Sequence, residues 1–318
     1  MTILAARPSA GKVGAAQLSV VSNTTLTLLK LLVGLTTGSV SVLSEAAHSA
    51  NDLVASVIAL VSVRISDRPA DDGHPYGHGK VESLSGMAEA ALIFGAAAWI
   101  IYEAVSKLAR GTEDFATGPG MAVMAVSVVV NVLVSRRLYA VAKRTDSMAL
   151  HADAEHLRTD VLTSVGVLVG LALVRWTGLH VLDPIVAILV ALLIVSAAWR
   201  LFAGAMAPLL DSGLPTAETD IVRGVLEAEA QVLGFHKLRT RKSGSSRHID
   251  CHVMLDDHLS LVDAHQAIEE LEDRIRALLP GTEVVLHAEP FEAEMEHQRR
   301  HHGGAPAEPD DDVPRERP

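Results

Sequence analysis

The chain has 318 residues, of which 49% are apolar, and it carries a formal net charge of −11. An acidic chain without a basic patch is not typical of a nucleic-acid-binding protein, so we expect no nucleic-acid partner. The single cysteine, Cys251, excludes a disulfide within this sequence and a zinc site built on a CxxC motif.

The mean hydropathy of +0.29 hides a sharp change along the chain. Up to about Ala207 the sequence consists of long apolar runs with few charges, and after Pro208 its composition is that of an ordinary soluble domain. This change predicts a short cytoplasmic N-terminus at 1–14, a membrane domain at 15–207 and a soluble domain at 208–291. The first apolar run has the length of a membrane span, and we interpret it as a retained span and not as a signal peptide.

Six apolar segments of the membrane domain are each long enough to cross ~30 Å of hydrocarbon as a helix. They lie at about 15–37, 42–64, 84–108, 118–138, 154–176 and 182–203. The connections after the second and fourth segments are rich in lysine and arginine, whereas the first and fifth carry few charges. The positive-inside rule therefore predicts that both termini are cytoplasmic, although Lys107 and Arg110 in the third connection weakly oppose this orientation.

The second and fifth segments each contain an H-x-x-x-D motif, formed by His48 with Asp52 and by His156 with Asp160. A spacing of four places each pair on one face of a helix. Together the two pairs offer two imidazole nitrogens and two carboxylates, a ligand set that suits tetrahedral Zn²⁺. An ionised aspartate at the bilayer centre costs about 2.5–3.5 kcal/mol, so it needs a partner, a metal or a water path. Either motif alone would also fit polar groups at a helix end.

The loop after the second segment reads PADDGHPYGHGK, residues 69–80. Asp71, His74 and His78 make it a candidate for a solvent-exposed metal site, because histidine and aspartate at short spacing are typical ligands. The alternative is a polar turn whose proline and glycines set the backbone.

The soluble part predicts a small α+β domain with the element order α-β-β-α-β. Residues 216–230 and 261–279 have helical patterns, and 235–244, 247–256 and 282–290 are predicted strands. In the middle strand Ile249, Cys251, Val253 and Leu255 share one face, because side chains alternate along a strand. Residues 292–318 are rich in proline, charge and histidine, and we expect a disordered tail.

Histidines are dense in this soluble part, and together with one glutamate they are candidate metal ligands. The set is His236, His252, His265, His287 and Glu289. His287 and Glu289 are two residues apart on a strand, so they share a face. Each histidine taken alone would also fit an ordinary surface position.

These motifs together resemble the cation diffusion facilitator (CDF) family, whose members exchange divalent cations for protons and include bacterial zinc exporters. The resemblance covers residues 15–290. It is carried by the six spans, the paired H-x-x-x-D motifs, the loop PADDGHPYGHGKVES and the C-terminal run LRTRKSG…HIDCHV…AHQAIEELE…VVLHAEP. It implies an all-α six-helix transmembrane domain, a metallochaperone-like cytoplasmic domain and a Y-shaped homodimer in the cell (inner) membrane.

The resemblance also implies a role for each group of candidate residues. His48, Asp52, His156 and Asp160 would form the transport site, and Asp71, His74 and His78 the loop site. The five residues of the soluble part would form a metal cluster at the dimer interface, and Lys80 with Asp211 a structural charge pair. In the bacterial zinc members most similar to this sequence, an aspartate stands at the position of His48. An aspartate is also common there at the position of Glu289.

We therefore interpret the sequence as a Zn²⁺/H⁺ antiporter that exports zinc from the cytoplasm by alternating access, with Zn²⁺ as substrate and regulatory ligand and H⁺ as coupling ion. We expect no enzymatic activity, and no H-E-x-x-H motif supports a membrane metalloenzyme. Two alternatives stay open. One is an exporter of Fe²⁺ or Mn²⁺ with the same fold, and the other is a membrane metal sensor or scaffold that does not transport.

Overall fold

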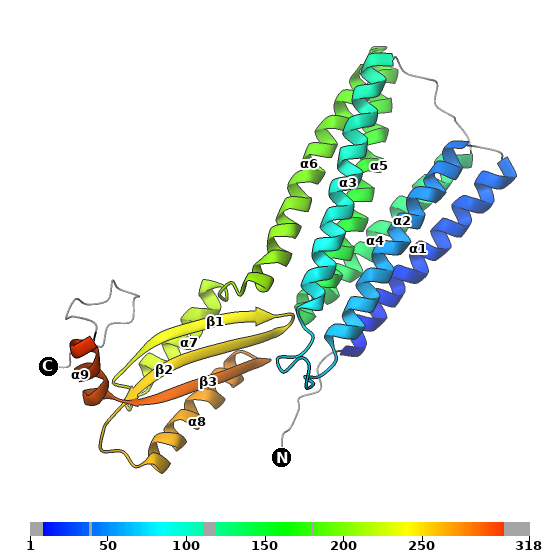
Figure 1. Cartoon of the computed structure of the whole chain (residues 1–318). Helices are drawn as coiled ribbons and strands as arrows, with labels where there is room; N and C mark the ends of the chain where they lie inside the picture. The colour runs from blue at the N-terminus through cyan, green and yellow to red at the C-terminus, as the bar shows by residue number, and fades with distance from the viewer. Residues whose placement is uncertain (1–8, 38–39, 111–118, 180, 302–318) are drawn as a thin grey trace. The chain divides into compact units, whose positions relative to one another are not determined.

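The computed structural model describes residues 9–37, 40–110, 119–179 and 181–301. The chain divides into two compact units, Met1–Leu209 and Leu210–Pro318. Figure 1 shows the helices of the first unit and the sheet of the second.

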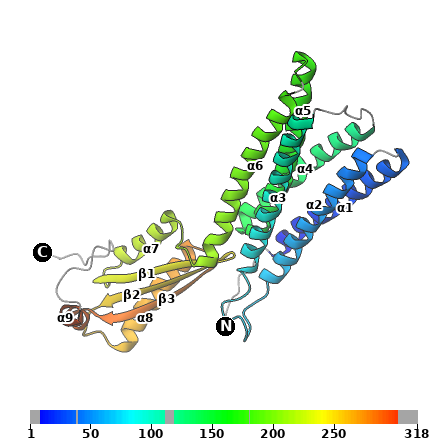
Figure 2. The ribbon, with the colours of Figure 1, turned by 45° about the horizontal axis from the view of Figure 1, so that its top comes forward.

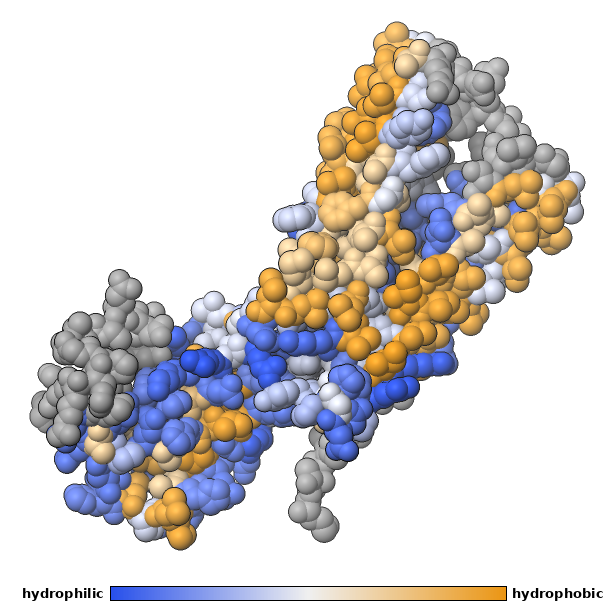
Figure 3. Space-filling model, in the orientation of Figure 1, coloured by the Kyte–Doolittle hydropathy of each residue, from blue (hydrophilic) through white to orange (hydrophobic). Residues whose placement is uncertain are grey.

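The first unit contains six helices that are long and apolar enough to cross a membrane, as the sequence predicted. They are α1 (Ser9–Thr37), α2 (Val40–Ser66), α3 (Val81–Arg110), α4 (Pro119–Thr145), α5 (Met148–Thr177) and α6 (Leu182–Met206), and a 3₁₀ turn at Ala207–Leu210 follows. Large apolar side chains of these helices, such as Trp99, Leu133 and Trp199, are exposed. The face of the helices seen in Figure 3 is largely apolar, which suits contact with lipid.

The connection between α4 and α5 is much shorter than the sequence predicted. The helix α4 continues to Thr145 instead of ending at 138, and α5 begins at Met148 instead of 154. The hydroxyl of Ser147 accepts a hydrogen bond from the backbone N–H of Leu150 and so caps α5. Hydropathy alone missed these turns because their polar and charged residues continue the helices beyond the apolar segments.

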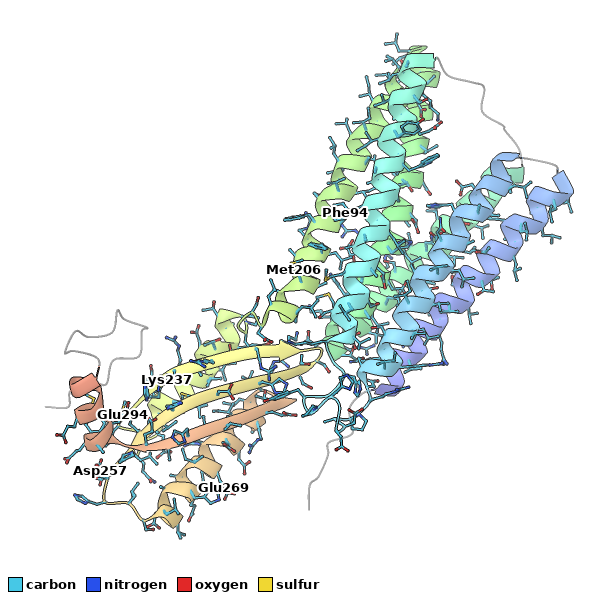
Figure 4. The ribbon with its side chains drawn as sticks, viewed as in Figure 1. Phe94, Met206, Lys237, Asp257, Glu269 and Glu294 are labelled. Atoms are coloured by element: carbon cyan, nitrogen blue, oxygen red, sulfur yellow. The ribbon has the colours of Figure 1, made fainter. Side chains whose placement is uncertain are left out.

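The helix α5 is packed against α2, α3, α4 and α6, and the pairs α1–α2 and α3–α6 lie side by side (Figure 2). Small residues allow this close packing, which is typical of membrane helices. A Cβ atom at Gly166 of α5 would lie 2.7 Å from Cγ2 of Val190 on α6. The half-buried ring of Phe94 on α3 packs against the α3–α5–α6 core (Figure 4). The position of α5 explains how its motif can meet residues of α2.

A buried carboxylate, Glu82, joins one end of four helices. Glu82 lies in the first turn of α3 and accepts a hydrogen bond from the ammonium of Lys12 on α1 at 3.1 Å. It also accepts from the hydroxyl of Ser66 on α2 at 2.9 Å and from that of Ser147 before α5 at 2.6 Å. A second carboxylate also lies near Lys12, because Oδ1 of Asp67 is 3.6 Å from the same ammonium. Because Lys12 is buried in an apolar unit, its charge depends on these partners.

The second unit is a three-stranded sheet with helices packed on one face. Its elements are α7 (Thr216–Ala228), β1 (Gly234–Ser243), β2 (Ser246–Leu255), α8 (Leu261–Leu278), β3 (Thr282–Pro290) and α9 (Phe291–His301). The strand order is β1-β2-β3, with β1 antiparallel and β3 parallel to β2. Ile249, Cys251, Val253 and Leu255 are buried against α7 and α8, which confirms the predicted alternation of β2.

The tail differs from the sequence prediction at its start. Residues up to His301 form the helix α9, where disorder was expected from 292 onward. Acidic residues Glu292 and Glu294 occupy its first turn, where they favour a helix N-terminus. Asp257 also accepts hydrogen bonds from the backbone N–H groups of Glu292 and Ala293. The rest of the predicted tail, 302–318, lies outside the described residues.

We predict that Glu82→Ala destabilises the first unit strongly. The change leaves the Lys12 ammonium buried beside Asp67 alone, and breaking a buried pair typically costs about 3–5 kcal/mol. The thermal midpoint of the purified chain in detergent measures the loss. Glu103→Ala on the same helix is the matched control, because Glu103 is exposed. Equal midpoints for the two variants would contradict the importance of this contact.

Candidate metal centres

The two H-x-x-x-D motifs meet between α2 and α5, and their side chains pair crosswise. Nε2 of His156 lies 3.3 Å from Oδ1 of Asp52, and Nε2 of His48 lies 3.8 Å from Oδ1 of Asp160. Ligand atoms of His48, Asp52 and Asp160 all lie within 4.8 Å of one another, and His156 joins them through Asp52. The structure thus brings together all four residues predicted for this intramembrane site.

Several atoms of the intramembrane site have unused bonding capacity. Nδ1 of His156 and Oδ2 of Asp160 are buried and have no hydrogen-bond partner among the described residues. Buried polar atoms are normally satisfied, so the unpaired carboxylate oxygen of Asp160 gives this site capacity to bind a cation. Imidazole nitrogen and carboxylate oxygen are both ligands of Zn²⁺ and related divalent ions.

A polar seam on α1 holds the part of α2 that carries His48 and Asp52. The amide of Asn23 donates to the backbone carbonyl of Asp52 at 3.3 Å. The hydroxyl of Thr27 donates to the carbonyl of Ser49 at 3.0 Å. These contacts fix the backbone between the two ligands of α2.

Lys30 continues this seam one turn further along α1. Its buried ammonium donates to the hydroxyl of Ser49 at 2.7 Å and lies 3.3 Å from the carboxylate of Glu45. Sequence reasoning did not identify the seam, although its polar residues at 23, 27 and 30 follow a helical spacing in an otherwise apolar span.

The loop residues Asp71, His74 and His78 also form a compact cluster. Oδ1 of Asp71 lies 3.2 Å from Nδ1 of His74, and Oδ2 lies 3.3 Å from Nε2 of His78. The backbone N–H of His74 donates to Asp71, and this hydrogen bond is the main cause that lowers the pKa of the carboxyl group. Gly77 takes a left-handed conformation with φ of 76°, which turns the chain back between the two histidines. The arrangement fits a solvent-exposed divalent ion.

A third cluster lies on the face of the sheet opposite α7 and α8. The strand register aligns His236 of β1, His252 of β2 and His287 of β3 in one row. Oε2 of Glu289 lies 2.6 Å from Nε2 of His236, and Oε1 lies 2.5 Å from Nδ1 of His252. The imidazole of His287 is 3.8 Å from the same carboxylate. One carboxylate thus contacts three histidines.

The β1 strand reaches this register through an irregularity next to His236. Pairing with β2 shifts between His236 and Arg239, and Lys237 between them has a positive φ of 53° (Figure 4). A bulge of this kind redirects a side chain at the end of a ladder. Burial raises the pKa of Glu289, but the hydrogen bonds with His236 and His252 outweigh it, and the net pKa is lowered.

Two of the residue groups predicted from the sequence, the sheet cluster with His265 and the Lys80–Asp211 pair, are not shown by the structure of a single chain. His265 lies on α8, exposed, and pairs with Glu269 at 3.5 Å, so it does not join the sheet cluster within the chain (Figure 4). Asp211 lies 3.8 Å from Arg241 within the second unit. Lys80 belongs to the first unit, so the Lys80–Asp211 pair stays a prediction.

Comparisons with known proteins match both units of the chain. The family model described as the cation efflux transmembrane domain matches residues 16–210, and that of the cation efflux protein cytoplasmic domain matches 214–291. The cation-efflux pump FieF of Salmonella arizonae is 35% identical over 265 residues, or 83% of this chain and 88% of that protein. The same pump of Salmonella newport is 34% identical over the same shares.

Two solved structures are similar over the C-terminal part. One is described as "Mode of Action of a Putative Zinc Transporter CzrB", with 29% identity, 24% of this chain and 98% of that chain covered, and a TM-score of 0.24. The other is the "Metal-bound C-terminal domain of CzcD transporter from Thermotoga maritima", with 26% identity, 24% and 94% covered, and a TM-score of 0.23.

We predict that His252→Ala removes metal binding at the sheet cluster. The change takes away the central nitrogen of the row, so the number of tightly bound Zn²⁺ ions should fall by about one per chain. Calorimetric titration of the full chain with Zn²⁺ measures the number. His258→Ala is the matched control, because His258 is exposed outside the cluster. The same stoichiometry in His252→Ala and the control would rule out a metal site there.

Proposed function

We propose that this chain, which belongs to the cation diffusion facilitator family, exports Zn²⁺ from the cytoplasm in exchange for protons. The family is one of cation efflux transporters and not of catalytic enzymes, and six apolar helices make the chain a multi-pass membrane protein. The choice of Zn²⁺, the proton coupling and the direction are the parts that we propose.

The crosswise pairing of two histidines with two aspartates inside the membrane unit carries the proposal. Two nitrogens and two oxygens in one cluster match the mixed ligation that Zn²⁺ accepts in tetrahedral sites. Mn²⁺ and Fe²⁺ are harder ions that favour oxygen ligands and higher coordination numbers. His48 is the residue that tips the set towards nitrogen, so it supports zinc over these two alternatives.

Proton exchange follows from the chemistry of the ligands. A metal ion binds the deprotonated forms of histidine and aspartate, so protons and metal compete for the same atoms. The unperturbed pKa of histidine, about 6.5, lies where a modest pH difference changes its protonation. Rocking of helices around this site, as in other secondary transporters, would expose it to each side in turn.

We also propose that the chain acts as a homodimer with both termini in the cytoplasm. The positive residues after the second and fourth spans support this orientation. The sheet cluster leaves His287 largely exposed, with its imidazole 3.8 Å from the Glu289 carboxylate. A metal bound there could take a further ligand such as His265 from a second copy, which would make dimer geometry depend on zinc.

Transport into proteoliposomes tests the proposal. The full chain is reconstituted, a pH gradient is imposed, and the uptake of Zn²⁺, Fe²⁺, Mn²⁺ and Cd²⁺ is compared. We expect Zn²⁺ to move fastest and its movement to collapse when an ionophore removes the pH gradient. Faster uptake of Fe²⁺ or Mn²⁺ than of Zn²⁺ would make that ion the substrate instead of Zn²⁺. Absence of any metal movement would favour a membrane metal sensor or scaffold.

We predict that Asp160→Ala abolishes zinc transport while folding is retained. The change removes a carboxylate that compensates the charge of the ion inside the membrane, and no other described acid contacts His48 within 4.0 Å. Zinc flux into proteoliposomes measures the loss, and size-exclusion elution checks folding. Glu103→Ala is the control and should transport normally. Transport at the wild-type rate by Asp160→Ala would place the site elsewhere.

We predict that His48→Asp keeps Zn²⁺ transport but discriminates less against Mn²⁺ and Cd²⁺. The variant exchanges a nitrogen for a carboxylate, which adds negative charge and a bidentate option. Loss of one imidazole should also change the pH dependence. Competitive transport of the three ions at a fixed pH gradient measures both effects. His151→Asp, at an exposed histidine of the same unit, is the control. An unchanged ranking in His48→Asp would remove the basis for assigning zinc.

A further inference from the structure

A lysine–glutamate pair lies next to the intramembrane site without being part of it. The ammonium of Lys30 on α1 is buried, lies 3.3 Å from Oε2 of Glu45 on α2 and donates to the hydroxyl of Ser49 at 2.7 Å. A buried ammonium in a membrane-spanning helix is costly unless it is paired, so Glu45 compensates Lys30. Apolar residues can often replace a buried ion pair that serves only packing.

Glu45 shares a helix face with the metal ligands of α2. It precedes His48 by three residues and Asp52 by seven, and both spacings bring side chains to one side of a helix. Because Asp52 contacts His156 on α5, this side of α2 is turned towards α5. Glu45 therefore lies one turn from His48, in the direction of Val40, where α2 begins.

The exposed side of the intramembrane site is the side on which Glu45 lies. The side chain of His48 is 46% exposed, whereas those of Asp52 and His156 are each 8% exposed. The side chain of Glu45 is 38% exposed, although that of its partner Lys30 is only 7% exposed. A cation that leaves the four ligands on the side of His48 therefore meets the carboxylate of Glu45 next.

Antiparallel packing continues this direction on α5. From the first ligand contact to the second, α2 moves back by four residues while α5 moves forward by four. The next turn brings Glu45 of α2 to the level of Thr163 and Ser164 of α5, whose hydroxyls donate to the carbonyl of Asp160 at 2.8 and 2.9 Å. Side-chain oxygens are the groups that these residues offer, and they suit Zn²⁺ less well than imidazole nitrogen does.

We propose that Glu45 receives the cation from the intramembrane site on its way out and that Lys30 prevents the cation from staying there. An ionised Glu45 without Lys30 would add a third negative charge next to two aspartates and would hold a divalent cation tightly. The pair with Lys30 is neutral overall, so a cation has to displace the ammonium from the carboxylate and is bound only weakly. Lys30 keeps the hydroxyl of Ser49 as a partner during this exchange.

This inference rests on the proposed function and adds a residue to the path of the cation. In the proposed orientation α1 runs outward from the cytoplasm and α2 returns, so Glu45 lies on the outer side of the four ligands. Glu45 differs from those ligands because its loss should slow the passage of zinc and leave zinc binding in place. A pair that only joins α1 to α2 would instead be dispensable when both charges are removed together.

Zinc uptake into proteoliposomes, measured over a range of Zn²⁺ concentrations, tests the proposal on the full chain. Lys30→Met/Glu45→Gln removes both charges and leaves neither partner of the pair as an uncompensated ion. It should bind as many zinc ions as wild type with the same affinity in calorimetric titration, but its maximal rate should fall by about 10-fold. Lys107→Met/Glu103→Gln is the matched control, because it makes the same exchanges at two positions of α3, and it should keep the wild-type rate.

Lys30→Met alone separates the part of the lysine from that of the glutamate. The variant leaves the carboxylate of Glu45 uncompensated next to the site, so zinc should be bound more tightly and released more slowly. Both KM and the maximal rate should therefore fall, a combination that a merely structural defect does not produce. This single variant also tests the proposal if size-exclusion elution shows that the double variant does not fold.

The outcomes separate this inference from the proposed function. A wild-type maximal rate in Lys30→Met/Glu45→Gln overturns the role of Glu45, and unchanged KM and rate in Lys30→Met overturn that of Lys30, while zinc export by the wild type stands in both cases. Loss of zinc binding in a folded double variant indicates a structural role and contradicts the proposal. A wild-type chain that moves no metal overturns the proposed function and this inference with it.

Discussion

Charge compensation inside an apolar unit is the constraint on which the first unit depends. An isolated ion there has neither water nor a high dielectric to stabilise it, so each buried charge needs an opposite one nearby. Lys12 meets Glu82, Lys30 meets Glu45, and the acids of the H-x-x-x-D motifs meet histidines. These pairs connect different helices, so the same contacts that neutralise charge also fix how α1, α2, α3 and α5 pack.

Charge compensation is also needed in the second unit, but less strictly. Its sheet buries an apolar face against α7 and α8 and leaves its histidine row on the opposite face, where the side chains are half-exposed. A single carboxylate, Glu289, contacts His236, His252 and His287. Water tolerates a residual charge there, so the cluster does not need a full set of acids to hold a cation.

The sequence predicted well what depends on local periodicity. The four-residue spacing placed His48 with Asp52, and His156 with Asp160, on helix faces, and the alternation of β2 placed Cys251 in the core. The spacing could not predict that each histidine would pair with the aspartate of the other motif, because that depends on how α2 packs against α5.

Long-range contacts account for what the sequence did not reveal. Glu82 resembles an ordinary acid at a helix N-terminus, yet its partners lie 70, 16 and 65 residues away. Strand register, which no single strand determines, aligns three histidines in a row but leaves His265 on a helix.

The number of carboxylates in each cluster follows from its surroundings and indicates what each can do. The intramembrane site has two, Asp52 and Asp160, so a bound divalent cation would be neutral overall and its helices could move past hydrocarbon at low electrostatic cost. The loop and sheet clusters have one each, Asp71 and Glu289, so a bound cation there keeps a net positive charge that solvent must stabilise. Neutrality suits an ion that crosses a membrane, whereas a residual positive charge suits a site that stays in water and attracts a further acidic or histidine ligand.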